Sequence, residues 1–352
     1  MSGLSHDNHF VPQGYLRNWS DDGVNVLAYR TLVPHERVPD WTPRSIRGIA
    51  FRRDLYTQVD RQGNESDAFE QWMATEIETP ALAAIDRAIH GRRLAPDDWK
   101  HLSLFYAAQD VRTPSNFLEC MERWREDLPG LIQRTLAESV ERIEQASREG
   151  TALPVQPVSP SGDTSGSVDV TIQREKNGSS KIYASVTTGR AMWVQEMRQL
   201  LDSIAKGLED HKWSIARPAP GLEWITSDHP ALKLNYNAPN DYDFGGGWGS
   251  RGTELILPIS PQHLLYTQIG SKAAPRFTFS AEKTQELRKL LAERAYRWIF
   301  AGEPLDDVVR FRPRVVDAAT YQAEELTWQS WHRDQSASET RPTSPAPSED
   351  KA

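Results

Sequence analysis

The chain is organised around residues 9–19, His9-Phe10-Val11-Pro12-Gln13-Gly14-Tyr15-Leu16-Arg17-Asn18-Trp19. Chain ends usually fray and carry small polar residues, so this density of large and functional side chains predicts a segment that is tied into the protein body. Pro12 fixes its own φ and favours an extended conformation at Val11, and the three large apolar residues that follow recur at helical spacing. We therefore expect a strand-like segment and then a short helix, with His9 and Gln13 aimed away from its apolar face.

The composition limits the class of protein. The chain has 352 residues, of which 38% are hydrophobic and 26% charged, enough for one large domain or two modest ones. Twelve tryptophans indicate a well-filled core or a binding groove. The formal net charge of −8 argues against a broad nucleic-acid-binding surface, which needs clustered lysine and arginine, but it is compatible with a local basic site.

The sequence also indicates a compartment. Cys120 is the one cysteine, so no intramolecular disulfide can form and nothing requires an oxidising environment. No apolar run approaches the ~20 residues of a membrane span, and the polar residues 1–6 lack the apolar region of a signal peptide. We expect a soluble cytoplasmic protein with no membrane partner.

Hydrophobic periodicity predicts helices first, and then strands mixed with helices. The first part should contain strands at 24–29 and 54–59, and helices over 66–91 with an end or kink at Pro80, 96–112, and 115–148 with an interruption at Pro129-Gly130. The second part should contain a hairpin of 168–172 with 182–186 around Asn177-Gly178, helices over 192–208 and 280–298, and strands at 222–226, 231–236, 253–258, 263–268 and 308–311.

This order favours an α+β fold, in which a mostly helical N-terminal part packs with an antiparallel or mixed sheet that carries helices. We expect the helical part over 1–149, a flexible linker or loop rich in Pro, Ser, Gly and Thr over 150–167, and a sheet-plus-helix part of the same domain over 168–333. Residues 334–352 are too polar to bury apolar surface, so we expect a disordered tail.

The opening stretch resembles the signature of a bacterial family called domain of unknown function 4238, His-x-Val-Pro-Gln followed by Tyr-Leu, a basic or polar residue and an aromatic. Gly14 stands where an aromatic is expected, and Trp19 where Phe is commoner. The other stretches that resemble the family are Ile77-Glu78, Gln109 with Arg112-Thr113-Pro114, Ile225-Thr226-Ser227-Asp228-His229-Pro230 and Leu257-Pro258-Ile259-Ser260-Pro261. The family name carries no activity, so the resemblance supports the fold more than any function.

His9 and two regions that contain carboxylates are candidates for a catalytic or metal-binding site. His9 needs a carboxylate partner to act as a base or a metal ligand, and otherwise it anchors the N-terminus. On a regular helix, Glu76 lies among the apolar residues of segment 66–78, and Glu78 on the opposite side. Glu78 is either a ligand or part of a solvated face. Asp228 follows an apolar strand, at a position that suits a catalytic or metal-binding carboxylate and equally a turn-forming aspartate.

Gln109 and Arg112 continue the apolar face of the helix that begins at Pro96. Buried polar groups need partners, and an arginine suits a carboxylate or a phosphate. Arg112 therefore predicts either a phosphate site or an internal ion pair with Glu78 that joins two helices.

Two other motifs are rejected. Residues 247–252 match Gly-x-Gly-x-x-Gly, but they lead into a predicted strand, whereas dinucleotide binding needs a strand before and a helix after the glycines. Cys120 lies in a charged helix without a nucleophile signature.

Whether the chain is an enzyme is left open. The first hypothesis is a metal-dependent, nuclease-like hydrolase of phosphodiester bonds, because such polar sets often carry chemistry. In it the catalytic residues are His9, Glu78 and Asp228, the substrate-binding residues are Gln13, Gln109 and Arg112, and a divalent metal ion is held by Glu78 and Asp228. The alternative is a non-catalytic binding or regulatory module, in which these residues form a structural network and the Trp-rich surface and Gly-rich loop receive a small ligand or a protein partner.

Overall fold

The computed structural model describes residues 4–60, 62–151, 168–174, 180–238 and 241–340 of the chain. It has an α+β fold, as the order of the predicted elements indicated. The N-terminal stretch forms strand β1 (Asp7–His9), helix α1 (Gln13–Leu16) and the 3₁₀ turn η1 (Arg17–Trp19), which confirms a strand-like segment followed by a short helix. His9 and Gln13 are half-buried, whereas the apolar residues of the stretch are buried.

Hydrogen bonds tie this stretch to the second half of the chain. The Tyr15 hydroxyl lies 2.7 Å from the Thr226 hydroxyl and donates to the carbonyl of Pro258. Asn18 Nδ2 donates to the carbonyl of Ile259 over 2.9 Å. Three of the stretches that carry the family resemblance therefore contact one another, and their side chains hold the fold together.

The segment predicted as one kinked helix is a helix with a π-helical turn in its middle. It consists of α2 (Ala68–Trp72), the π turn η3 (Met73–Glu78) and α3 (Thr79–Ile89). Pro80 has no N–H to donate, and its ring would clash with the carbonyl four residues earlier. The N–H and hydroxyl of Thr79 instead both reach the carbonyl of Ala74, five residues back.

This turn corrects the predicted positions of two glutamates. A π turn rotates each residue by less than the 100° of an α-helix, so the residues after Met73 fall on different faces from those expected. Glu76 is exposed and Glu78 turns toward the protein interior, where its side chain keeps 19% of its accessible surface. The prediction that Glu76 shares the apolar stripe, with Glu78 opposite it, is wrong.

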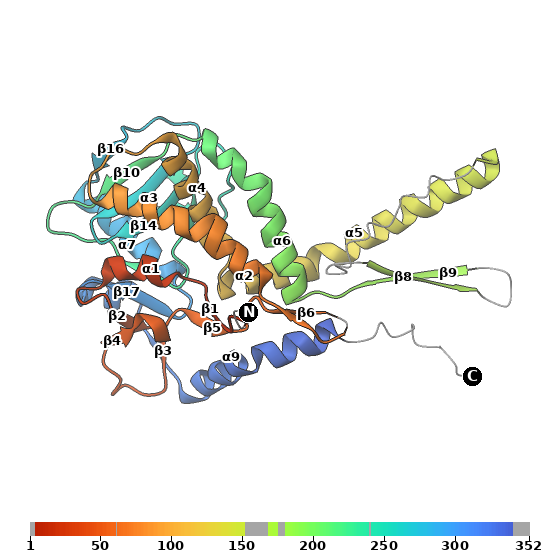
Figure 1. Ribbon diagram of the computed structural model, residues 1–352, viewed down its shortest axis with the longest axis horizontal. Coiled ribbons are helices and arrows are strands. Elements are labelled where there is room, and N and C mark those ends of the chain that lie inside the picture. Colours follow the sequence, from red (N-terminus) through yellow and green to blue (C-terminus); the bar gives the residue numbers. More distant parts are fainter. Residues whose placement is uncertain (1–3, 61, 152–167, 175–179, 239–240, 341–352) are drawn as a thin grey trace.

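The remaining helices of the first part follow the predicted pattern. Helix α4 (Pro96–Val111) begins at Pro96, with Asp97 and Asp98 in its first turn. Helix α5 (Pro114–Glu149) runs through Pro129, so the predicted interruption there is wrong. Pro129 is exposed, and water can bind the carbonyl that its missing N–H leaves free. In Figure 1, α5 and the hairpin of β8 (Val168–Arg174) with β9 (Ser180–Val186) project from the body.

Most of the second part is built on two sheets. The six-stranded sheet has the order β13-β12-β14-β15-β10-β16, and the four-stranded sheet has the order β11-β17-β2-β4. The strands of the first are β10 (Ser214–Arg217), β12 (Leu232–Ala238), β13 (Asp241–Asp243), β14 (Glu254–Ser260), β15 (His263–Gln268) and β16 (Arg276–Thr278). Those of the second are β2 (Asn25–Arg30), β4 (Trp41–Ser45), β11 (Thr226–Ser227) and β17 (Trp298–Ala301).

Short strand pairs and further helices complete the fold. The pairs are β1 with β5 (Phe51–Arg53), β3 (Leu32–Val33) with β18 (Val315–Val316), and β6 (Gln58–Val59) with β7 (Glu65–Ser66). The helices and 3₁₀ turns are η2 (Ile46–Gly48), α6 (Arg190–Asp202), η4 (Ile204–Asp210), α7 (Ala281–Arg294), α8 (Asp306–Phe311) and α9 (Ala318–Glu339). No helix in the described part of the chain combines the length and the apolar composition of a membrane span.

Two predictions for the C-terminal region are wrong. Residues 308–311 belong to α8 rather than to a strand, because Asp306 and Asp307 begin a helix and β17 already fills the place beside β2. Residues 334–339 belong to α9 rather than to a disordered tail. Glu339 of this helix forms a buried ion pair with Arg190, and Trp331 of the same helix is buried. Residues 341–352, the Asn177-Gly178 turn and all of the predicted linker except residues 150 and 151 lie outside the described residues.

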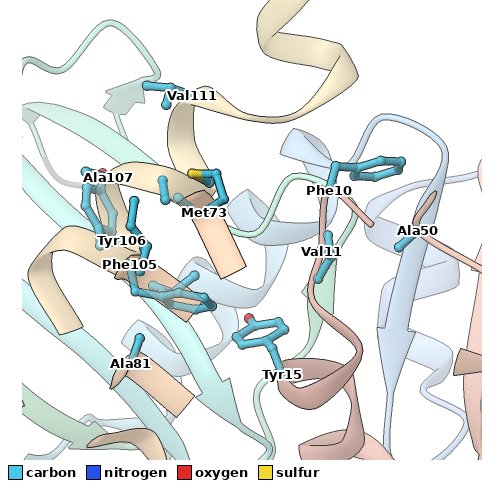
Figure 2. Packing of buried hydrophobic residues seen from close by; sticks show 14 of the residues in the cluster. Phe10, Val11, Tyr15, Ala50, Met73, Ala81, Phe105, Tyr106, Ala107 and Val111 are labelled. Carbon is cyan, nitrogen blue, oxygen red and sulfur yellow. The ribbon is translucent and has the colours of Figure 1, made fainter. Parts of the chain in front are cut away.

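One large apolar core joins the two predicted parts. It contains Tyr15 and Phe105 from the helical part and Ile259 and Phe300 from the sheets. Figure 2 shows the Tyr15 ring beside Phe105, and their centroids lie 5.8 Å apart. The N-terminal stretch is therefore part of the core itself.

Candidate functional site

Arg112 is the centre of a polar cluster, which we call the Arg112 cluster and define as His9, Tyr56, Glu70, Glu78 and Arg112. Arg112 ends helix α4, and its side chain is fully buried. Its Nη1 forms an ion pair with Glu78, and its Nη2 donates to the His9 carbonyl over 2.6 Å. The Tyr56 hydroxyl donates to the Arg112 carbonyl over 2.5 Å, and Arg112 Nε contacts the same hydroxyl at 3.4 Å.

The neighbouring groups of the cluster favour the positively charged form of Arg112. Burial alone lowers the pKa of an arginine, but the carboxylate of Glu78 and the neighbouring Tyr56 and Glu70 raise the pKa of Arg112 above its ordinary value. The internal ion pair with Glu78, one of the two alternatives from the sequence, is the arrangement in the structure. It joins η3 to α4 and, through the His9 carbonyl, to β1.

Glu70 is a further member of the cluster. Its Oε2 is buried and has no hydrogen-bond partner among the described residues. Burial raises the pKa of Glu70 to about 7, against the opposing effect of Arg112. Only the fold could show this, because Tyr56 and Arg112, the neighbours of Glu70 in the cluster, come from other segments of the chain.

Replacing Glu70 by glutamine should change how stability depends on pH. The folded chain holds the Glu70 proton up to about pH 7, whereas the unfolded chain releases it near the ordinary value of 4.5. Wild-type stability should therefore fall as the pH rises between these values, by on the order of 1–3 kcal/mol, and this fall should be absent from Glu70→Gln. Denaturation at a series of pH values measures the difference, and two parallel curves would contradict it.

The other predicted residues of this region are close to the cluster. The His9 ring is half-buried against Phe51, with Nε2 3.2 Å from the Arg47 carbonyl, and burial lowers the pKa of His9. Gln109 lies one turn before Arg112 and is fully buried, and neither atom of its amide has a partner among the described residues. Gln13 is half-buried at the start of α1.

Asp228 has a separate set of hydrogen-bond partners. Its carboxylate accepts hydrogen bonds from the backbone N–H groups of Tyr296, Arg297 and Trp298 at 2.9, 2.7 and 3.1 Å. Burial raises its pKa to about 6, although these bonds act in the opposite direction. Within the described part of the chain, no hydrogen bond or ion pair joins Asp228 to the Arg112 cluster.

The structure therefore brings together three predicted site residues, His9, Glu78 and Arg112, and leaves Asp228 apart from them. Among the described residues, no group of three or more His, Cys, Asp or Glu side chains is arranged to hold a metal ion. A metal held by Glu78 and Asp228 stays a prediction.

A cavity of about 330 Å³ lies between α4, α5, α6 and the Gly-rich loop, and the ring of Trp193 in its lining lies 5.6 Å from the ring of Tyr56 of the Arg112 cluster. We call it the Gly-loop cavity. Its lining includes Asp110, Asn116, Cys120, Arg123, Trp193, Glu196, Met197, Leu200, Lys233 and residues 246–249. Asp110 accepts from Trp248 Nε1 over 2.9 Å and pairs with Lys233 at 2.8 Å, which fixes the loop. Burial raises the pKa of the Cys120 thiol to about 12, as expected for a cysteine that is not a nucleophile.

Gly246 is needed where this loop passes strand β12. A Cβ atom at Gly246 would lie 2.7 Å from Thr253 Cγ2 and 2.9 Å from the backbone carbon of Lys233, closer than real contacts allow. A Cβ at Gly249 would meet nothing within 4 Å. The sequence signals for this cavity were the Gly-rich loop and the tryptophan count, whereas Asp110 and Lys233 carried none.

Comparison with known proteins gives one match. A family model described as "Protein of unknown function (DUF4238)" matches residues 7–304, which include the whole Arg112 cluster and the Gly-loop cavity. No curated protein and no solved structure matches the chain.

Proposed function

This chain belongs to the DUF4238 family, and we propose that it is a non-catalytic binding module that holds a small ligand in the Gly-loop cavity. The main support for the proposal comes from the burial and the hydrogen bonds of Arg112. Its guanidinium is fully buried, and its donors contact Glu78, His9 and Tyr56 of the same chain. A buried arginine with this set of partners supports a structural role better than the binding of a phosphate.

The Gly-loop cavity has the properties of a small-molecule site. Its volume of about 330 Å³ lies in the range of ligand pockets. Apolar groups from Trp193, Met197 and Leu200 line it beside a few polar groups. Such a mixture buries a ligand and also orients it.

The charges around the cavity indicate the kind of ligand. Asp110 is paired with Lys233, and Arg123 is paired with Glu196. Because each lining charge has an opposite partner, an ion of either sign gains little there. A flat, uncharged or zwitterionic molecule fits best, and aromatic amino acids and nucleosides are suitable probes.

His9 supports the second candidate, the metal-dependent hydrolase. Its lowered pKa leaves the imidazole neutral near pH 7, as a general base requires, and Glu78 lies in the same cluster. The two candidates differ in their ligands. The module needs a small organic molecule and no metal, whereas the hydrolase needs a divalent ion.

Thermal-shift titrations should distinguish them. We expect at least one of the aromatic amino acids or nucleosides to raise the melting temperature saturably, because a ligand of the folded state stabilises it by mass action. The effect should be lost in Gly246→Ala, which displaces the loop, and kept in the matched control Gly207→Ala, which lies outside the cavity lining and where a Cβ would meet nothing within 4 Å. A saturable rise with Mg²⁺, Mn²⁺ or Zn²⁺ that disappears in Glu78→Gln would favour the hydrolase. A flat response to every organic probe would count against the module.

A further inference from the structure

A second cavity, of about 460 Å³, lies between helix α9, the start of α5 and strand β5. We call it the α9 cavity. Its walls are mainly aromatic and aliphatic, with Phe117, Trp328 and Trp331 among the lining residues. Arg52 of β5 lines the same cavity and is 6% exposed. Helix α9 lies beyond the residues that the family model matches.

Arg52 differs from the other buried arginines of the described chain. Each of those has a carboxylate within ion-pair distance, and they are Arg30, Arg112, Arg190, Arg288 and Arg297. Arg52 Nε and Nη2 donate only to the carbonyls of Trp328 and Thr327, at 3.3 and 2.7 Å. Within the described residues Nη1 has no hydrogen-bond partner, so one donor edge of the guanidinium is available to a ligand.

Burial without a paired carboxylate makes the charged form of Arg52 less favourable. Burial lowers the pKa of its guanidinium to about 9, so the group is still charged at neutral pH. The ring faces of Trp328 and Trp331 lie 4.2 and 4.4 Å from it and recover part of that cost by cation–π attraction. A buried charge without a counter-ion is otherwise unfavourable, and an anion in the cavity would complete the site.

The two carboxylates that line the cavity, Glu324 and Asp334, favour the charged form of Arg52 from a distance but form no ion pair with it. Glu324 forms ion pairs with Arg30 and Arg297. Asp334 bonds to Ser330 and Arg333, and neither carboxylate is within ion-pair distance of Arg52. A second donor of the wall, the indole N–H of Trp331, is buried and has no acceptor among the described residues. Two donors of the wall, Arg52 Nη1 and the Trp331 indole N–H, therefore lack an acceptor among the described residues.

We propose that the α9 cavity binds a small organic anion, a flat apolar body that carries one carboxylate or phosphate group, with the acidic group on Arg52. The aromatic walls bury the body, and the guanidinium matches the geometry of a carboxylate or a phosphate. The volume admits a molecule of two or three fused rings and is small for a folded polypeptide segment.

Calorimetric titration of the full chain tests this, with 1-naphthoate as the carboxylate probe, 1-naphthyl phosphate as the phosphate probe and 1-naphthamide as their uncharged counterpart. We expect at least one of the two acids to bind at least about tenfold more tightly than the amide, which corresponds to about 1.4 kcal/mol. Arg52→Gln should remove this preference, because the amide side chain keeps a donor and loses the charge.

A second pair of variants separates binding from folding, because Arg52 also holds helix α9. Ala323→Trp fills the cavity from an exposed position and leaves Arg52 in place, whereas Ala319→Trp puts the same side chain on α9 outside the lining. Binding should be lost in the first variant and kept in the second. The proposal would be overturned if the acids and the amide bound with equal affinity, or if both acids had a dissociation constant above about 1 mM. Full binding by Ala323→Trp would overturn it as well. Inorganic phosphate binding as tightly as the naphthyl acids would also overturn it, because the walls would then contribute nothing.

Discussion

Replacing Arg112 by methionine should lower the free energy of unfolding by about 3–5 kcal/mol, the usual cost of removing one partner of a buried ion pair. The substitution keeps the apolar length of the side chain and removes its donors. It leaves Glu78 without its cation, and the His9 carbonyl without its Arg112 donor. Chemical denaturation of the variant and the wild type gives the difference.

The double variant Glu78→Gln with Arg112→Met is the control. With the charge removed from both partners, the double variant should lose less stability than the sum of the two single changes, and this difference measures the coupling. Replacing Glu78 alone leaves the fully buried Arg112 without its carboxylate, so this change should cost at least as much as replacing Arg112, which leaves a glutamate that keeps some contact with solvent. An Arg112→Met protein of unchanged stability would show that the ion pair does not stabilise the fold and would reopen the phosphate-binding role predicted for Arg112.

Asp228→Ala should destabilise the chain by about 3 kcal/mol or more. The carboxylate is the acceptor for three consecutive N–H groups, and each buried donor that is left unsatisfied costs about 1–3 kcal/mol. Asp228→Asn should fall between alanine and the wild type, because one amide oxygen can accept and the amide nitrogen cannot.

Melting curves in the presence of Mg²⁺, Mn²⁺ and Zn²⁺ distinguish this structural role from metal binding. Asp228→Ala should melt below the wild type by the same interval in every solution. An interval that widens with one metal would mean that the metal stabilises the wild type through Asp228. The metal site predicted from the sequence would then be supported.

Local signals were enough for much of the fold. Pro12 and the apolar spacing after it indicated a strand and then a short helix, and Pro96 with its two aspartates marked the start of α4. Pro80 correctly marked a place where the helix is irregular, but the irregularity is a π-helical turn rather than the predicted end or kink. A proline within a helix can end it, kink it or widen one turn, and the choice depends on what the helix packs against. Only the structure shows that the widened turn lets Glu78 reach Arg112.

The candidate site was harder to predict, because its contacts join residues that are far apart in the sequence. The pair of Glu78 with Arg112 was one of two alternatives, since both residues lay on neighbouring predicted helices. Glu70 gave no signal until the fold buried it. Arg52 depends on helix α9, whose residues after 334 have the composition of a disordered segment and are held by Arg190. Composition describes a segment in isolation and does not register the partner that orders it.

The pairing of strands from the two ends of the fold sets the order of events during synthesis. Strand β2 lies beside β17, β3 beside β18, and Arg30 binds Glu324, 294 positions later. Contacts of such long sequence separation form slowly, and they cannot form until the C-terminal residues have left the ribosome. Strands β2 and β3 are therefore synthesised early and paired late. Until β17 and β18 arrive, the edges of β2 and β3 that they cover stay open, and the nascent chain is most prone to aggregation during this interval.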